Sequence, residues 1–180
     1  MKPVYSILIL LIVVFISSCQ KETETVTSTN SSFKAQKNSS SWVSTDTWGT
    51  YSETDQMFYL NAVKQHPKTD QDEELSISFE MADLGKTLVT SNFSSEWVRV
   101  AGGGSVADGY HIDLSADNEI EILSVDTQKK IISGKFSIQL IRDSKFSNKG
   151  ETLIFKSGYF SVRYGQVENY REKPKLESYL

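Results

Sequence analysis

Apolar and polar residues alternate with a period of two along most of the chain after Phe33. Residues 75–81, 110–115 and 132–140 each place apolar side chains at every second position. This period predicts strands with one buried and one solvent-facing side, and in residues 110–115 it assigns Tyr110, Ile112 and Leu114 to the buried side. No segment shows a helical stripe of ten or more residues. We therefore expect an all-β fold, an antiparallel β-sandwich or barrel.

The C-terminal third predicts a three-stranded meander. Residues 120–125 and 131–142 read as two strands, and Asp126 begins the turn between them because its side chain can hydrogen-bond the backbone two residues on. A third strand over residues 153–164 follows a polar segment. Its apolar set moves from odd to even positions, which predicts an extra residue, a β-bulge, near Gly158.

The N-terminus has the order of a lipoprotein signal. Lys2 precedes an apolar run from Val4 to Ile16, and two serines then lead to Cys19, the only cysteine. The run is too short to span a bilayer as a helix, which needs roughly 20 residues. We expect residues 1–18 to be cleaved and Cys19 to be lipidated, with palmitate and diacylglycerol as chains that anchor the protein in the membrane. The alternatives are an ordinary secretory signal and an uncleaved membrane helix.

The segment after Cys19 is rich in Thr, Ser and Asn and has too little apolar surface to fold. We therefore divide the chain into a lipidated cysteine and flexible tether over 19–32, one β domain over 33–170 and a charged tail over 171–180. The start Cys-Gln-Lys-Glu-x-Glu resembles the signal that sends Bacteroidota lipoproteins to the outer face of the outer membrane. The alternative interpretation is a solvated charge cluster beside the lipid.

Composition excludes several classes of partner. The formal net charge of −4 becomes −5 once residues 1–18, with Lys2, are removed. A mildly acidic chain without a basic stripe is poorly suited to nucleic acid, and equally to lying flat on anionic lipid. With Cys19 lipidated, the domain has no thiol for a disulfide, a metal site or a nucleophile.

Several strand motifs resemble a family of Bacteroidota lipoproteins of unknown function. They are Phe33-x-Ala35 followed by Trp42, then Ile120-x-Ile122 with Asp126, residues 132–136 (Ile-Ser-Gly-Lys-Phe) and Gly158-x-Phe160. The resemblance covers residues 31–48 and 118–164 and implies a β-rich, surface-anchored domain with no assigned catalytic residue. The usual Asn-Gly or Asp-Gly turn before the Trp is replaced by residues 37–41, so we expect a longer turn there.

Four polar features carry chemical candidates. His111, Asp113 and Ser115 have the residue types of a hydrolase triad, but residues two apart on a straight strand are roughly 6.6 Å apart, too far for proton transfer. We therefore interpret these three residues as a solvent-facing polar row along one strand. The acidic run 70–74 is interpreted as a solvated loop rather than a calcium site, because it lacks the glycine of an EF-hand loop. Residues 102–105 (Gly-Gly-Gly-Ser) predict a hairpin tip, since no P-loop lysine follows. His66 has no second ligand at zinc spacing.

Aromatic residues offer a further candidate, a carbohydrate or peptide platform. They also dominate ordinary β cores, which is the interpretation that we favour for any one of them. The set is Trp42, Trp48, Tyr51, Phe58, Tyr59 and Trp97.

These observations predict a lipid-anchored lipoprotein, exposed at the cell surface on the outer membrane, with a non-catalytic β domain. Its partners are the membrane, through the lipid, and an unknown extracellular ligand or protein, with no nucleic acid, cofactor, metal or catalytic residue; the ligand-binding residues stay unknown. One alternative is a structural or protective partner of another envelope protein. The other is a hydrolase using carboxylates such as Glu119 and Glu121, which share one face of a strand.

Overall fold

We describe the protein from a computed structural model. The structure describes residues 31–69, 71–81, 88–90, 93–101, 104–145 and 149–167. These residues form eleven β-strands and no α-helix. The strands are Ser32–Lys37 (β1), Ser40–Val43 (β2), Asp46–Ser52 (β3), Met57–Lys64 (β4), Gln71–Glu80 (β5), Leu88–Thr90 (β6), Phe93–Ala101 (β7), Ser105–Ile112 (β8), Glu119–Asp126 (β9), Ile131–Arg142 (β10) and Thr152–Val167 (β11).

The strands form one sheet that curls into a near-barrel ring. Their order is β2-β1-β11-β3-β4-β5-β7-β8-β10-β9-β6, and a further pairing of β10 with β11 closes the ring. Every pairing is antiparallel except that of β11 with β3, which is parallel. The all-β, mostly antiparallel prediction is confirmed, and of its two open alternatives the ring is the closer description. The predicted meander is also confirmed, as β9, β10 and β11.

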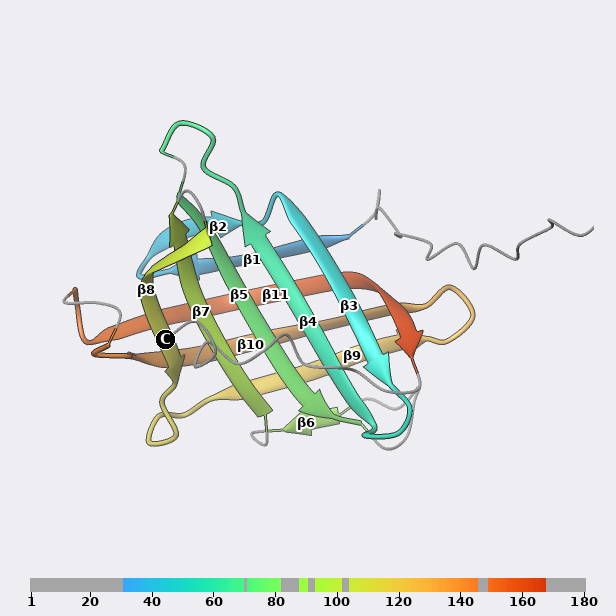
Figure 1. The fold of residues 1–180 in the computed structure, drawn as a ribbon. Coiled ribbons are helices and arrows are strands. Elements are labelled where there is room, and N and C mark those ends of the chain that lie inside the picture. Colours follow the sequence, from blue (N-terminus) through green and yellow to red (C-terminus); the bar gives the residue numbers. More distant parts are fainter. Residues whose placement is uncertain are drawn as a thin grey trace, which may run out of the picture.

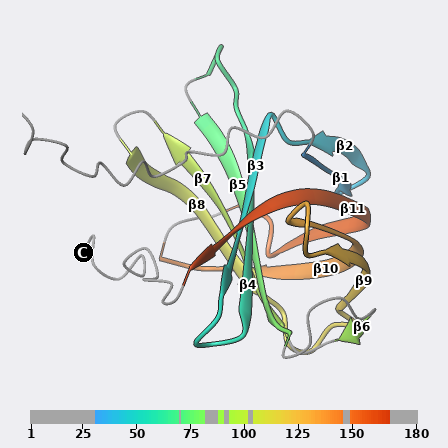
Figure 2. The same cartoon turned by 90° about the vertical axis from the view of Figure 1, so that its right-hand side faces the viewer.

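The ring is flattened into two layers that face one another across the core. One layer is β3, β4, β5, β7 and β8, and its strands cross those of the other layer, which includes β1, β11, β10 and β9 (Figure 1). Figure 2 shows the two layers from the side. The long strand β11 joins them, because its first part pairs with β10 and β1 and its last four residues pair with β3.

Large aromatic side chains fill the space between the layers. Phe33 is fully buried, and its ring lies 5.0 Å from the ring of Phe136 and 5.8 Å from that of Phe160, centroid to centroid. On the other layer, the ring of Phe58 lies 5.0 Å from that of Tyr164. Each of these residues stands at an alternate position of its strand, as the period of two predicts.

The bulge predicted in the last strand is confirmed. Phe136 pairs with Gly158 but Ile138 pairs with Phe155, so two residues of β11 oppose one residue of β10. The pairing of β11 with β1 shifts at the same place. The left-handed backbone conformation belongs to Ser157, with φ of 52°, rather than to the glycine beside it. The bulge restores the inward phase of the strand after Phe155.

The turn between β1 and β2 is shorter than predicted. Lys37 pairs with Ser40, which leaves only Asn38 and Ser39 in the loop. Both have positive φ, 46° and 69°, which is the backbone of a type I′ hairpin turn. Asn38 also accepts a 2.9 Å hydrogen bond from the backbone N–H of Ile154 through its side-chain oxygen. Asn tolerates this backbone without a following glycine, so the expected longer turn is wrong.

The alternation at residues 110–115 ends earlier than predicted. β8 stops at Ile112, and Asp113 begins a turn by accepting hydrogen bonds from the Ser115 N–H and hydroxyl. Tyr110 is buried, but Leu114 is 87% exposed. The prediction that Leu114 is buried is therefore wrong, because a turn breaks the strand before it.

Several predicted segments lie outside the described residues. These are the signal segment 1–18, Cys19, most of the tether 19–32 and the tail 171–180. Within the residues that the structure describes, no helix is long and apolar enough to cross a membrane.

Candidate functional site

Residues 71–74 of the acidic run lie in a strand, not in a solvated loop as predicted. Residues 71–74 open β5, while Asp70 lies outside the described residues. Glu73 shares the inward side of β5 with Leu75, and only 12% of its side chain is exposed. The Asp72 carboxylate instead accepts a 3.0 Å hydrogen bond from the backbone N–H of His66. The interpretation as a solvated loop is wrong because residues 71–74 pair with β7 and Lys37 of β1 contacts Glu73.

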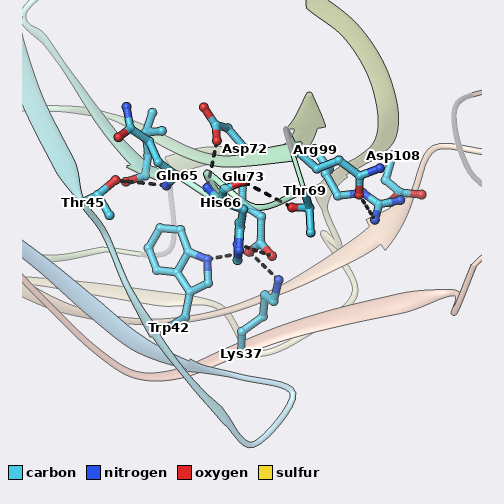
Figure 3. Close-up of polar contacts among 12 residues, drawn as sticks. Lys37, Trp42, Thr45, Gln65, His66, Thr69, Asp72, Glu73, Arg99 and Asp108 are labelled. Carbon is cyan, nitrogen blue, oxygen red and sulfur yellow. Dashed lines mark hydrogen bonds and ion pairs between the residues drawn. The ribbon is translucent and has the colours of Figure 1, made fainter. Parts of the chain in front are cut away.

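The Glu73 carboxylate is the centre of a polar cluster at one end of the ring (Figure 3). Its Oε2 atom accepts a 2.6 Å hydrogen bond from the indole Nε1 of Trp42 and a second bond from the ammonium of Lys37. The Nε2 atom of His66 lies 3.5 Å from Oε1. Lys37 also stands 4.8 Å above the ring of Trp97, a cation–π distance. Residues from β1, β2 and the β4–β5 loop thus converge on one carboxylate of β5.

Electrostatics hold this carboxylate in its ionised form. Burial alone would raise the pKa of Glu73. The hydrogen bond and charge of Lys37, together with Trp42 and Lys64, lower this pKa by more than burial raises it, so the net shift is downward. Burial also lowers the pKa of Lys37, and Glu73 offsets this only in part because Lys64 and Arg99 repel the ammonium. The pKa of Glu73 falls because several groups hydrogen-bond or attract its carboxylate. The pKa of Lys37 falls because burial outweighs the attraction of its one carboxylate partner.

A second ion pair lies beside the first. Arg99 and Asp108 face each other from the paired strands β7 and β8, and the Nζ atom of Lys149 lies 3.2 Å from Asp108. Asp108 is only 3% exposed. The hydroxyl of Tyr110, two residues along β8, donates a 2.9 Å hydrogen bond to the Gly150 carbonyl and so attaches the β10–β11 loop to this end of the ring.

The chemistry of the two ion pairs is that of a structural network. Each carboxylate is contacted by at least two donors, and for Glu73 the net effect is a lowered pKa. An ionised, ion-paired carboxylate is poorly suited to act as a general acid. The network closes one end of the ring with side chains in place of apolar packing. Three buried nitrogen atoms in it, His66 Nε2, Trp97 Nε1 and Arg99 Nε, have no hydrogen-bond partner among the described residues.

The structure does not assemble a triad from His111, Asp113 and Ser115. His111 is exposed at the end of β8, whereas Asp113 and Ser115 belong to the turn after it. Asp113 bonds Ser115 through one oxygen and accepts a 2.9 Å hydrogen bond from the Gln139 side chain through the other. The hydrogen bonds of Ser115, and then that of Gln139, lower the pKa of Asp113. These contacts stabilise a turn, and the prediction of a polar row along one strand is wrong.

The other carboxylates do not form a metal site. Among the described residues, no group of three or more His, Cys, Asp or Glu side chains could hold a metal ion. Glu119 and Glu121 do share the outward side of β9, as predicted, because Ile120 and Ile122 are buried. The Oε2 atom of Glu121 lies 3.7 Å from the Nζ atom of Lys135 on β10.

The aromatic candidates divide into two groups. Four are at most 5% exposed and belong to the core: Trp42, Tyr51, Phe58 and Trp97. Trp48 and Tyr59 are only half-buried and point outward from the adjacent strands β3 and β4. The sequence analysis did not separate the two groups, although the alternation of inward and outward positions along each strand could have done so. Tyr51 and Phe58 are inward, so Trp48 and Tyr59, at the opposite parity of the same strands, must face out.

Trp48 and Tyr59 are part of a polar surface on the outer side of β3, β4, β5 and β7, which we call the aromatic face. Two rows of cross-strand partners cross it: Trp48, Asn61, Ser76 and Glu96 form one, and Thr50, Tyr59, Ser78 and Ser94 form the other. Hydrogen bonds link neighbours within the rows, from the Ser76 hydroxyl to the Asn61 oxygen at 2.8 Å and between Ser78 and Ser94 at 2.7 Å. The face thus combines aromatic rings with amides, hydroxyls and carboxylates.

The remaining surface features offer little. A shallow hollow of about 100 Å³ lies beside the β1–β2 turn and is lined by Gln36, Asn38, Ser39, Ile154 and Lys156. The predicted glycine-rich tip joins β7 to β8, since Ala101 pairs with Ser105, but Gly102 and Gly103 lie outside the described residues.

Comparisons with protein families, with curated proteins and with solved structures returned no match.

Proposed function

We propose that this protein is a lipoprotein anchored through Cys19 in the outer membrane, and that its β domain binds an extracellular ligand without catalysing a reaction on it. The sequence order of charged, apolar and small residues before Cys19 supports the anchor. The aromatic face supports binding and is the observation on which that part of the proposal depends. The likeness to Bacteroidota lipoproteins supports a position at the cell surface.

The aromatic face has the chemistry of a carbohydrate or peptide platform. Aromatic rings present flat apolar area at a small entropy cost, and polar neighbours supply directional hydrogen bonds. Trp48 and Tyr59 stand on adjacent strands, diagonal to one another, because Trp48 pairs with Asn61 and Thr50 pairs with Tyr59. Asn61 and Ser76 continue the row of Trp48 across β4 and β5. An extended ligand could therefore contact both rings and the polar row together.

Binding is tested with a glycan array and an array of extended peptides, probed with the chain from Gln20 to Leu180. Trp48→Ala should abolish the signal for any array member that the unchanged chain retains. Thr127→Ala, in the exposed β9–β10 turn outside this face, is the control and should leave the signal intact. Equal signals from the Trp48→Ala and Thr127→Ala chains, or no retained member at all, would contradict the proposed face.

The anchor is tested separately by labelling cells with a fatty-acid analogue. Cys19→Ala should lose the label and leave the membrane fraction, whereas Ser17→Ala, which keeps a small residue before the cysteine, should be labelled normally. Equal labelling of the Cys19→Ala protein and the unchanged protein would overturn the anchor.

A second candidate function is that of a structural partner of another envelope protein. Among the described strands, β2 lies at one end of the sheet order and pairs only with β1. Val43 on this strand is 53% exposed. An uncovered strand edge with an exposed apolar residue is a place where an extended segment of another chain can pair.

A further inference from the structure

Charged residues are divided between the two layers of the ring. Strands β3, β4, β5 and β7 contain six acidic and two basic residues. Strands β1, β10 and β11, which are neighbours in the other layer, contain six lysines and arginines and no acidic residue. The next strand of that layer, β9, contains Glu119, Glu121 and Asp126 and no basic residue, so the basic region ends at β10. The two outer surfaces therefore differ in charge, and the net charge of the whole chain does not represent either of them.

Four of those six cations point outward and are exposed: Lys34, Lys135, Lys156 and Arg163. We call the outer side of β1, β11 and β10 the basic face. Tyr159 lies at its centre, because it pairs with Lys34 on one side and with Lys135 on the other. The Nζ atom of Lys34 stands 5.6 Å from the centre of the Tyr159 ring.

The basic face has a polar and an apolar border. On the β9 side, Glu121 pairs with Lys135, whose side chain is still 60% exposed. On the other side, the row through Lys34 continues to Val43 on β2, which is 53% exposed. Cations, a tyrosine and an exposed apolar side chain thus lie in one row across four strands.

The point where the N-terminal segment joins the domain lies on this same layer. The side-chain oxygen of Ser31 accepts a 3.1 Å hydrogen bond from the Arg163 N–H, and Ser32 pairs with Ser161. Twelve residues, Gln20 to Ser31, separate Cys19 from the first strand. At about 3.4 Å per residue they can span at most about 40 Å. A lipid on Cys19 would therefore keep the basic face within reach of the membrane.

We propose that the basic face docks on the anionic headgroups of the membrane that holds the lipid anchor. This inference rests on the proposed anchoring through Cys19. Lysine and arginine are attracted to anionic headgroups, and tyrosine is enriched where an apolar region meets water. The aromatic face belongs to the opposite layer, so docking through the basic face directs it away from the membrane. The sequence shows no basic stripe, which is why the mildly acidic chain was not expected to lie flat on anionic lipid, but the sheet register gathers four cations from three strands on one side.

The test uses the chain from Gln20 to Leu180, without lipid, and flotation with vesicles. Phosphatidylcholine vesicles containing one third phosphatidylglycerol should carry the chain, and pure phosphatidylcholine vesicles should not. The double variant Lys34→Glu with Lys135→Glu should bind the anionic vesicles at least about tenfold more weakly. Added salt should weaken binding of the unchanged chain, because it screens surface charge over roughly 10 Å.

The matched control is the double variant Lys68→Glu with Lys145→Glu, two exposed loop lysines that change the net charge by the same amount. It should bind like the unchanged chain. All chains should have the same melting temperature, which shows that the substitutions leave the fold intact. Equal losses in the two double variants, or no binding of the unchanged chain to anionic vesicles, would overturn the proposal. Because the assay contains no acylated cysteine, its outcome is independent of the labelling test of Cys19.

A second copy of the chain is the competing occupant, since its acidic layer is complementary to the basic face. Analytical ultracentrifugation at low salt distinguishes the two. A monomeric chain that binds anionic vesicles supports membrane docking. A dimer that the Lys34→Glu and Lys135→Glu changes dissociate, without any effect on vesicle binding, would assign the basic face to self-association and overturn the proposal.

Discussion

The ring of Phe136 covers the backbone of Gly158, its cross-strand partner. A methyl group built on Gly158 would lie 2.4 Å from Cε1 of that ring, closer than non-bonded carbon atoms approach. The neighbouring pair repeats the arrangement in the opposite direction, since a methyl group on Gly134 would lie 2.5 Å from Cζ of Phe160. Each strand thus places an aromatic ring over a glycine of the other, which accounts for both glycines in the middle of long strands.

Gly158→Ala should therefore destabilise the protein by about 1–3 kcal/mol, the usual cost of overpacking a core. Gly165→Ala on the same strand is the control, because a methyl group there would meet no atom within 4 Å. Urea unfolding of both variants measures the difference. Equal free energies of unfolding for the two would show that the Phe136 ring moves aside at no cost.

Phe136→Ala should destabilise the fold by about 3–5 kcal/mol, since it removes a buried phenyl ring. Phe136 is 4% exposed, and its ring contacts those of Phe33 and Phe160. Lys135→Ala should cost less than about 0.5 kcal/mol, as is usual for exposed positions. A larger loss for Lys135→Ala in urea melts would mean that the inward and outward sides of β10 are reversed.

Local pattern was sufficient to predict the C-terminal meander. In residues 132–140, one buried side and a short turn at Asp126 indicate the strand and its partner, because the pairing strands are consecutive in the chain. The register shift between Ser133 and Gly134 was not predicted. The carboxylate of Asp126 accepts hydrogen bonds from the N–H groups of Gln128 and Lys129, as the turn requires. Alternation alone does not show where a strand ends, which is why Leu114 was wrongly predicted to be buried.

The candidate site could not be predicted in this way, because its residues are distant in sequence. Lys37 lies 36 positions before Glu73, and the two meet only because the curled sheet brings β1 across the ring from β5. The parallel pairing of β11 with β3 has no local signal at all. Without knowledge of this pairing, nothing in the sequence places β1 near β5, and residues 70–74 are interpreted as a charged loop. Similarly, the basic face needs the register of three strands before its four cations can be assigned to one side.

Ser157 offers a test of the bulge. Its φ of 52° lies in the left-handed region, which costs a residue with a side chain roughly 1 kcal/mol relative to glycine. Ser157 is exposed, so its side chain contributes little packing. Ser157→Gly should therefore raise the free energy of unfolding by about 0.5–1 kcal/mol, and Ser157→Val should lower it, because a β-branched residue tolerates this conformation poorly. Thermal melts that rank valine above glycine would contradict the positive φ.

Glu73→Gln should destabilise the protein by about 2–4 kcal/mol at neutral pH, because it leaves the mostly buried Lys37 ammonium without its carboxylate. The effect should depend on pH. The pKa of Glu73 is lowered in the folded state, so its ionised form contributes stability above the ordinary carboxyl pKa of 4.5. That contribution is lost as the pH falls through the lower pKa of the folded protein.

The unchanged protein should therefore lose more stability between pH 5 and pH 2 than the Glu73→Gln variant does, and the two should converge at the acidic end. Thr127→Ala, an exposed substitution in the β9–β10 turn that changes no charge, should instead follow the unchanged protein at every pH. Urea melts at a series of pH values measure all three. A constant gap between the unchanged protein and Glu73→Gln down to pH 2 would mean that the carboxylate acts through packing alone. A gap that closes on acidification shows that the charge of Glu73, held by Lys37 and Trp42, stabilises this end of the ring.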